Sequence, residues 1–283
     1  MKYPPTGINR ISQFLISFIL RFFITSLFFL IKSSLADINI TYLGHSCFFI
    51  NINNTYILID PYSYELNYPY LKEFQNNKEF KNLSYIISTH THFDHFNENI
   101  FKLYKHKYIK GADDNNWYPF YIDNNKIKIY NFGVYHDENY GQERGKNSII
   151  VIQTNINNKE IKLVHLGDIG HTLNENNNYI NKKNLNIKEI KNCDILFIPV
   201  GGYFTIDINK INELINFINP KSIIPMHYKN KYIPDFPIAN LNDFLNNPKI
   251  KQTLNKYKII KTNQQINLKE IRANQLIIFD IYK

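Results

Sequence analysis

Short apolar runs separated by polar turns recur along the chain from Asp37 onward, and the spacing within each run predicts its conformation. Runs of about four to eight apolar or alternating residues are typical of β-strands. A longer segment, 207–218, places isoleucine and leucine at helical spacing, which predicts a helix with an apolar face. The predicted strands are 38–43, 47–52, 56–59, 83–88, 126–130, 148–153, 160–166, 194–200, 222–226, 257–260, 265–268 and 275–281.

Further helices are predicted between these strands, at 71–80, 97–104 and 241–245. Asn53-Asn54 separates two strand patterns and predicts a hairpin turn, because asparagine tolerates the left-handed backbone of such turns. An asparagine-rich stretch, 174–184, predicts an exposed loop. No internal repeat and no boundary of a second domain is evident, so residues 37–283 are expected to form one α/β domain.

The first 36 residues have a different pattern. Basic residues up to Arg21 precede the apolar run 22–31, and Ser34-Leu35-Ala36 supplies the small residues that signal peptidases prefer. This plan predicts a secretory signal peptide. The alternative is an uncleaved membrane anchor, although a span from 11 to 31 would bury Arg21 at a cost of several kcal/mol. Either interpretation predicts an exported domain, periplasmic or extracellular, that meets the membrane only through this segment.

Composition narrows the class of protein. With 283 residues, 44% hydrophobic and 20% charged, the chain is of ordinary globular composition. The formal net charge is +9, but without residues 1–36 the 33 basic residues fall to 29, against 24 acidic ones. This small excess favours a solvated face over tolerance of anionic substrates and predicts no nucleic-acid partner. The expected partner is a small-molecule substrate. The two cysteines, Cys47 and Cys193, are expected to be buried free thiols, with a single bridge as the alternative in an exported protein.

The candidate chemistry is concentrated in Thr89-His90-Thr91-His92-Phe93-Asp94-His95, directly after a predicted strand. Histidines two residues apart at a strand end can converge on one point, and a turn lets Asp94 and His95 face a second point nearby. Imidazoles and carboxylates are ligands that zinc, manganese and iron accept. The stretch therefore predicts metal binding rather than a solvated polar loop.

Other potential ligands also follow predicted strands, namely His136, Asp168 and His227. In folds built on layered sheets, sites form where strand ends converge. Together with the four residues of the 90–95 stretch they make seven ligands, which is about what two adjacent divalent cations require.

The ordered set His-x-His-x-Asp-His, a later His, a Gly-Asp and a final His resembles the metallo-β-lactamase superfamily. Finer details resemble its ascorbate-6-phosphate-lactonase-like branch of hydrolases, and the similarity runs from about Asp37 to His227. The resemblance implies a four-layer αββα sandwich, with two mixed β-sheets flanked by helices and the site at one edge of the sheets. The details are Tyr42-Leu43-Gly44-His45-Ser46, Asp60-Pro61, Arg144-Gly145-Lys146-Asn147, the segment 165–171, the segment 201–207 and Ile224-Pro225-Met226-His227-Tyr228.

Carried over position by position, the resemblance implies two divalent cations. Zinc is the expected metal and manganese and iron are alternatives, because the same ligands serve all three. Such cations lower the pKa of a bound water, so that hydroxide can attack a carbonyl or phosphoryl centre. Asp94 is expected to be the catalytic carboxylate that orients the nucleophile or carries its proton. The implied ligands are His90, His92 and His136 for the first cation, Asp94, His95 and His227 for the second, and Asp168 as the bridge.

Four more residues are expected to support the site or contact the substrate. Asp60 is a candidate acceptor for a ligand imidazole N–H, or simply part of a turn that ends a strand. His45 either faces the site or caps a strand. His165 is a candidate core or supporting residue, and His171 a supporting residue or substrate contact. Gly201-Gly202 either offers backbone N–H groups to a substrate anion or makes a tight turn.

The leading functional hypothesis is a dinuclear hydrolase of a small-molecule lactone, ester or phosphodiester. A β-lactamase is an alternative that the site chemistry allows. An exported, non-catalytic metal-binding protein of the same fold is a second alternative, against which the complete ligand set argues. A nuclease of this superfamily usually carries an inserted domain and a di-iron redox protein a flavin domain, and the length of the chain favours neither.

Overall fold

The computed structural model describes residues 38–173 and 187–281. The predicted signal peptide or anchor, 1–36, and the predicted loop, 174–184, lie outside the described residues. Within the described part of the chain, no helix is long and apolar enough to cross a membrane.

The first of two β-sheets has six strands. In their order across the sheet they are β13 (Gln265–Asn267), β1 (Ile38–Gly44), β2 (Cys47–Ile52), β3 (Thr55–Ile59), β4 (Tyr85–Ser88) and β5 (Tyr108–Lys110). The strands from β13 to β3 pair antiparallel, and β4 and β5 continue the sheet in parallel. Asn53 and Asn54 both have positive φ, which confirms the predicted hairpin turn between β2 and β3.

The second sheet has eight strands. In order they are β12 (Lys258–Thr262), β14 (Gln275–Phe279), β11 (Ser222–Met226), β10 (Ile195–Pro199), β9 (Lys159–His165), β8 (Lys146–Ile156), β7 (Ile127–Tyr135) and β6 (Tyr121–Asp123). The strands from β12 to β9 pair in parallel, whereas β9 to β6 pair antiparallel. Both sheets are therefore mixed, as expected.

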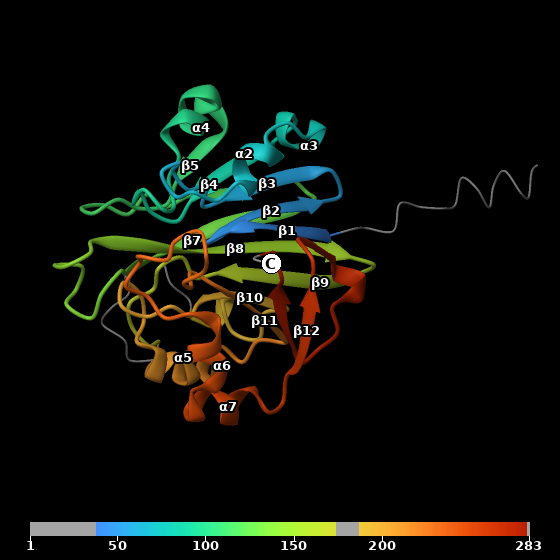
Figure 1. Cartoon of the computed structure of the whole chain (residues 1–283). Helices are drawn as coiled ribbons and strands as arrows, with labels where there is room; N and C mark the ends of the chain where they lie inside the picture. The colour runs from blue at the N-terminus through green and yellow to red at the C-terminus, as the bar shows by residue number, and fades with distance from the viewer. Residues whose placement is uncertain (1–37, 174–186, 282–283) are drawn as a thin grey trace, which may run out of the picture. The chain divides into compact units, whose positions relative to one another are not determined.

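Helices cover the outer face of each sheet (Figure 1). On the first sheet lie α2 (Tyr70–Phe74), α3 (Lys78–Lys81) and α4 (Glu98–Leu103), and on the second α5 (Ile211–Ile218), α6 (Leu241–Asn246) and α7 (Pro248–Leu254). Short 3₁₀ turns lie at 105–107, 187–189, 208–210 and 268–270. The layers follow the order αββα, which confirms the predicted sandwich.

Three apolar clusters hold these layers together. Because successive strand residues point to opposite faces of a sheet, Phe48 packs between the two sheets while Phe49 packs under α2 and α3. The third cluster lies between the second sheet and α5–α7, where Leu214 and Phe244 are fully buried. Cys47 and Cys193 are buried free thiols, as expected, and belong to the two different outer clusters.

Several helices differ from their prediction. The helix predicted at 71–80 is two short helices, α2 and α3, because Asn77 leaves the helical conformation with φ of −67° and ψ of 141°. Asparagine favours caps and turns over helix interiors, since its side chain competes for backbone hydrogen bonds. The helix α7 was not predicted, although Asn247 caps its first turn and Pro248 is its first residue. The short strands β5 and β6 were not predicted either.

Candidate metal centre

The residues predicted to bind metal lie together at one edge of the sandwich, where strands of both sheets end. Nearly all of these polar side chains are buried. The first sheet contributes His45 from the β1–β2 turn, Asp60 after β3 and the 90–95 loop after β4, and the second contributes His136 after β7, Asp168 after β9 and His227 after β11. The edge is therefore a buried polar cluster built from strand ends.

The backbone turns sharply at three of these strand ends. His45, Asp60 and His227 adopt positive φ values of 52°, 49° and 53°. Positive φ is uncommon for residues other than glycine, and such strain is concentrated at functional sites. The backbone N–H of His227 also donates to the carbonyl oxygen of His45 at 3.0 Å, which joins the two sheets beside the cluster.

A first group of potential ligands consists of His90, His92 and His136, whose ligand atoms lie within 4.8 Å of one another. His90 Nε2 and His92 Nδ1 are 3.1 Å apart. Two imidazole nitrogens bound to one tetrahedral cation at about 2.0–2.1 Å are separated by about 3.3 Å, so this spacing fits a shared cation. The hydroxyl of Thr89 donates to Asp60 and lies 3.1 Å from His90 Nδ1, which leaves Nε2 to face the group.

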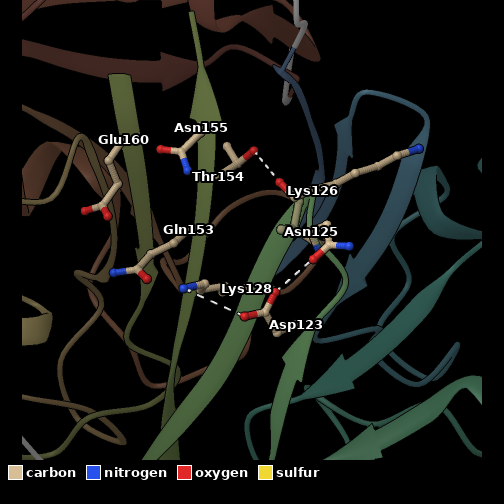
Figure 2. A pocket seen from close by; sticks show the side chains of 9 residues that line it. Asp123, Asn125, Lys126, Lys128, Gln153, Thr154, Asn155 and Glu160 are labelled. Atoms are coloured by element: carbon tan, nitrogen blue, oxygen red, sulfur yellow. Dashed lines mark hydrogen bonds and ion pairs between the residues drawn. The ribbon is translucent and has the colours of Figure 1, made fainter. Parts of the chain in front are cut away.

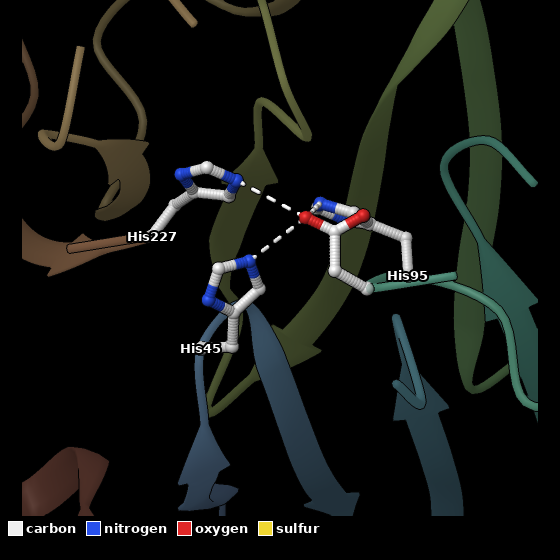
Figure 3. Close-up of side chains that lie close together, drawn as sticks. His45, His95 and His227 are labelled. Carbon is white, nitrogen blue, oxygen red and sulfur yellow. Dashed lines mark hydrogen bonds and ion pairs between the residues drawn. The ribbon is translucent and has the colours of Figure 1, made fainter. Parts of the chain in front are cut away.

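A second group consists of His45, Asp94, His95 and His227. Asp94 Oδ2 lies 3.0 Å from His45 Nε2, 3.4 Å from His227 Nε2 and 3.7 Å from His95 Nε2. Figure 3 shows the rings of His45 and His227 directed at this carboxylate, with the ring of His95 beside it. His45, expected as a supporting residue, therefore lies inside the second group.

Asp168 lies between the two groups. Its Oδ1 is 3.1 Å from His95 Nε2, and its Oδ2 is 3.1 Å from His227 Nε2 and 3.4 Å from His136 Nε2. Asn147 fixes this position, because its side-chain oxygen accepts the backbone N–H of Asp168 at 3.2 Å. One carboxylate thus contacts ligands of both groups, which is the position of a bridging ligand.

The donor atoms of this cluster fit metal ions. Among the described residues, the Nε2 atoms of His95, His136 and His227 and the Oδ1 atom of Asp168 find no hydrogen bond, although all are buried. A buried polar atom left without a partner costs about 1–3 kcal/mol. These atoms approach one another at ion-pair distances without the alignment of hydrogen bonds, as expected of ligands directed at a common centre. The cluster can therefore hold divalent cations.

The charges of the cluster reinforce this conclusion. Burial alone would raise the pKa of Asp94 and of Asp168, but the neighbouring imidazoles hold both pKa values well below their usual range. Burial would lower the pKa of His227, but Asp168 and Asp94 raise it to about 9. The pKa of His95 is raised well above its usual value by the same carboxylates and Asp60, against the effect of burial. A cation that binds here meets two charged carboxylates and displaces protons from these imidazoles.

Asp60 holds the ring of His95 from behind. Its Oδ2 is 2.7 Å from His95 Nδ1, and its carboxylate also accepts the backbone N–H and the hydroxyl of Thr89, at 2.7 and 2.9 Å. A carboxylate that accepts the second N–H of an imidazole fixes the ring orientation and makes the other nitrogen a better ligand. Asp60 was expected either to be part of a turn that ends a strand or to accept an N–H of a ligand imidazole. In the structure it follows the end of β3 and also contacts the imidazole of His95.

His165 and His171 lie outside both groups and do not line the cavity above them. The Nε2 of His165 lies 3.1 Å from the carbonyl oxygen of Ser46, and its Nδ1 accepts the N–H of Gly167 at 3.1 Å. Both ring nitrogens are thus used, which agrees with the core interpretation of His165. His171 is buried, its Nδ1 lies 2.9 Å from the carbonyl oxygen of Thr172, and burial lowers its pKa to about 4.

One neighbour of the first group was missed by sequence reasoning. Asp114 Oδ1 lies 3.1 Å from His92 Nε2, so this carboxylate turns His92 Nδ1 toward His90. Asp114 is largely exposed and lies in an irregular polar segment, where neither apolar spacing nor a strand end draws attention to it. Only the folded chain brings it beside the 90–95 loop.

Two glycines allow close approach of the backbone behind the potential ligands. A Cβ atom on Gly170 would lie 2.1 Å from the carbonyl oxygen of His136, and one on Gly201 would lie 2.3 Å from that of His227. These contacts require glycine, since real Cβ atoms essentially never approach within 3.0 Å. The tight approach to His227 accounts for Gly201 without a substrate anion.

We expect these contacts to give site-selective effects. Gly170→Ala should weaken metal binding by the first group, and Gly201→Ala by the second, each by about 10- to 100-fold, as for other changes that displace a ligand. Metal titrations of the folded variants measure this. Gly202→Ala is the control, because its φ of 62° is strained but its nearest neighbour lies 3.7 Å away. Equal metal affinities in all three variants and the unmodified chain would show that these glycines do not set the positions of His136 and His227.

A cavity of about 420 Å³ opens above the cluster. Its lining residues are His92, Phe93, Asp94, His136, Glu143, Arg144, Asp168, Phe204 and Phe236. A separate hollow of about 270 Å³ (Figure 2) lies beside β7 and β8, at the opposite end of β7 from His136. It is lined by polar side chains such as Asp123 and Lys128, which form an ion pair at 3.7 Å, and holds none of the potential metal ligands. The cavity above the cluster is therefore the candidate substrate site.

Comparison with known protein families agrees with this geometry. The model of a beta-lactamase superfamily domain matches residues 39–227, which include every residue of both groups. The chain belongs to the metallo-β-lactamase superfamily. The resemblance noted in the sequence is thereby confirmed at the level of the superfamily.

Relatives and solved structures of the superfamily resemble most of the chain. A protein of Hyperthermus butylicus named a metal-dependent hydrolase is 26% identical over 67% of this chain and 82% of its own length. A protein of the same name from Staphylothermus marinus is 28% identical over 69% and 85%. A crystal structure of a metallo-β-lactamase superfamily protein from Thermotoga maritima, 24% identical, covers 86% of this chain and 98% of its own with a TM-score of 0.56, which shows the shared fold. The expected enzyme class, a metal-dependent hydrolase, is confirmed at this level.

Proposed function

We propose that the chain is a dinuclear metal-dependent hydrolase that cleaves a lactone, ester or phosphodiester bond in a small molecule. The observation that carries the proposal is the position of Asp168, whose two oxygens contact His95 and His227 of one ligand group and His136 of the other. A single cation would not need a carboxylate between two groups of ligands. Membership of the superfamily supports the coarser assignment to hydrolases.

The proposal assigns the ligands as two sets joined by one carboxylate. His45 is assigned as a hydrogen-bond partner of Asp94 rather than as a metal ligand, because its Nε2 lies 3.0 Å from Oδ2 of Asp94. Zinc is the preferred metal, with manganese and iron as alternatives, because imidazole and carboxylate serve all three. The ligands are His90, His92 and His136 for the first cation, Asp94, His95 and His227 for the second, and Asp168 for both.

When bound, two cations at this position acidify water and stabilise negative charge that develops on the substrate. The chain supplies the remaining functions. Asp94 lines the cavity, so its carboxylate can orient the attacking water and take its proton. Phe204 and Phe236 form apolar walls of the same cavity, and a substrate bound against them would displace water and so strengthen electrostatic interactions inside it.

The proposal also includes the branch of the superfamily, the location of the protein and the size of its substrate. The ascorbate-6-phosphate-lactonase-like branch is favoured by the motifs around His45, Asp60 and Asn147, all of which lie in or beside the cluster. Export to the periplasm or the extracellular space is inferred from the pattern of residues 1–36. The expected substrate is a small molecule, in keeping with a cavity of about 420 Å³.

Removal and return of metal test the proposed function. We expect chelation to abolish hydrolysis of a panel of esters, lactones, phosphodiesters and β-lactams, and zinc to restore it. His92→Ala should lower kcat/KM at least about 10²-fold, because it removes a ligand directly. His106→Ala is the matched control, since this exposed histidine lies in the 105–107 turn outside both groups.

Three outcomes would contradict the proposal. Full activity of the chelated chain or of His92→Ala would show that the cluster is not the catalytic centre. Two bound cations without turnover of any member of the panel would favour a non-catalytic metal-binding protein. Preference for β-lactams over the other substrates would instead favour a β-lactamase.

A further inference from the structure

Three phenylalanines wall the cavity above the metal centre. The ring of Phe236 lies 6.2 Å from that of Phe93 and 6.0 Å from that of Phe204, measured between ring centroids. Phe93 keeps 47% of its surface exposed although it lies between two potential ligands in the sequence. Aromatic side chains that line an open cavity with a few polar groups are typical of small-molecule sites. The wall suits a planar, apolar part of a substrate.

Arg144 is the only lysine or arginine among the described residues that line this cavity. Its guanidinium carbon lies 6.0 Å from the centre of the Phe204 ring, and 31% of its side chain is exposed. The ion-pair partner that the structure gives it is the adjacent Glu143, at 3.9 Å. Exposed ion pairs contribute only about 0–1 kcal/mol. A ligand carboxylate or phosphate, which can accept two parallel N–H bonds, can therefore replace Glu143.

The loop that carries Arg144 is held in place by a buried carboxylate. Asp137 accepts backbone N–H groups of Asn139 and Gly141 at Oδ1 and of Glu143 and Arg144 at Oδ2, over distances of 2.8–3.2 Å. This loop directly follows His136, a residue of the first ligand group. Arg144 thus belongs to a loop whose backbone is held by Asp137 and which follows a residue of the metal centre. A guanidinium held in this way loses less conformational entropy when it binds a ligand.

Arg144 also lies where two cavities meet. A second cavity, of about 410 Å³, shares Glu143 and Arg144 with the first and is otherwise lined by Asp137, Glu138, Asn139, Gly170, Thr205, Asp207 and Lys210. Of its acidic residues, Asp137 accepts the N–H groups of its own loop and Asp207 accepts the N–H of Asn209. Lys210 is already paired with Glu138 at 2.5 Å. The guanidinium therefore separates an apolar chamber over the metal centre from a polar one, so a polar end group of a substrate can lie beside it.

We propose that the substrate is a small molecule with a planar apolar body and an anionic end group, a carboxylate or a phosphate, which Arg144 binds. The scissile bond lies over the metal centre, the body lies against the wall formed by Phe93, Phe204 and Phe236, and the anion lies at the junction of the two cavities. This inference rests on the proposed function and narrows its substrate class.

Binding of non-hydrolysable probes to the metal-loaded full chain tests the inference. Calorimetry compares two pairs of different length, benzoate with terephthalate and biphenyl-4-carboxylate with biphenyl-4,4′-dicarboxylate. The two lengths sample two separations between the metal centre, where one carboxylate is expected to bind, and Arg144, where the second is expected to bind. We expect at least one dianion to bind about 10- to 100-fold more tightly than its monoanion, as a charge-assisted bidentate contact provides.

Matched variants of adjacent residues identify the group responsible. Arg144→Gln should reduce the preference for the dianion to about 2-fold or less, on the scale of ordinary surface contacts, and leave the metal content unchanged. Glu143→Gln should keep or increase the preference, because it removes the carboxylate that competes for the guanidinium. 4-Phosphonobenzoate, compared with terephthalate, distinguishes a phosphate from a carboxylate end group.

The inference would be overturned by either of two results. One is a preference for dianions that Arg144→Gln retains, and the other is no preference at either probe length. Because the probes are not hydrolysed, these results are independent of turnover. Failure of the hydrolysis panel with a preserved, Arg144-dependent preference would therefore count against the proposed reaction and not against the anion site.

Discussion

Replacement of Asp168 by alanine is expected to release both cations and to lower kcat/KM by at least about 10³-fold. This decrease is larger than the one expected when a single group that stabilises the transition state is removed. Asp168 contacts His95, His136 and His227 at 3.1–3.4 Å, so its carboxylate reaches residues of both ligand groups. Two divalent cations bring four positive charges, and without Asp168 only the carboxylate of Asp94 remains inside the groups to offset them. Elemental analysis and kinetics of the purified variant measure both effects.

The comparison for this variant is a carboxylate outside the metal centre. Asp123 lines the hollow of Figure 2 and pairs with Lys128, and this hollow holds no residue of either ligand group. Asp123→Ala should keep the metal content and the kinetic constants of the unmodified chain. If Asp168→Ala keeps both cations, the bridging role is wrong. If the variant keeps one cation, one ligand group binds its cation without the carboxylate of Asp168, and the expected loss of both cations is wrong.

Replacement of Asp60 by asparagine is expected to affect both stability and metal affinity. The buried carboxylate accepts three hydrogen bonds, from the N–H and hydroxyl of Thr89 and from His95 Nδ1. An asparagine amide turns one of these acceptors into a donor, so a donor of Thr89 or His95 faces another donor. We expect the free energy of unfolding to fall by about 3–5 kcal/mol, as when one partner of a buried pair is removed. Metal affinity should fall by about 10- to 100-fold, because the ring of His95 loses its orientation.

A second carboxylate, in an ion pair away from the metal centre, separates these two effects. This carboxylate, Asp194, is only partly buried, with 12% of its side chain exposed; it directly precedes β10, at the opposite end from the metal centre, and binds Lys221 at 2.7 Å and the N–H of Lys162 at 2.9 Å. Asp194→Asn should also lower the free energy of unfolding but leave metal affinity unchanged. Chemical denaturation and metal titration of both variants give the two quantities. Equal metal affinity of Asp60→Asn and the unmodified chain would show that Asp60 only ends a strand.

The sandwich and most of the cluster could be predicted because their determinants are local in the sequence. Each potential ligand follows an apolar run, and the layered fold brings the ends of such runs to one edge. The spacing of His90, His92 and His95 alone restricts where their side chains can point. The seven predicted ligands therefore lie together in the structure, although their coordination of metal stays a prediction.

Other features depend on contacts that no local pattern specifies. His45 joins the second group because the backbone there is left-handed and its carbonyl oxygen accepts the N–H of His227, from the other sheet. Asp114 reaches His92 only through the folding of an irregular polar segment. The break between α2 and α3 follows from the extended backbone conformation of Asn77, which the helical spacing of the apolar residues around it does not indicate.

The central claim is that this edge of the sandwich binds two divalent cations joined by Asp168. Its most direct test is a crystal structure of the zinc-loaded chain with anomalous diffraction recorded at the zinc absorption edge. We expect two anomalous peaks, one among His90, His92 and His136 and one among Asp94, His95 and His227, each in contact with an oxygen of Asp168. A single peak at full zinc occupancy, or a peak pair that Asp168 does not touch, would contradict it.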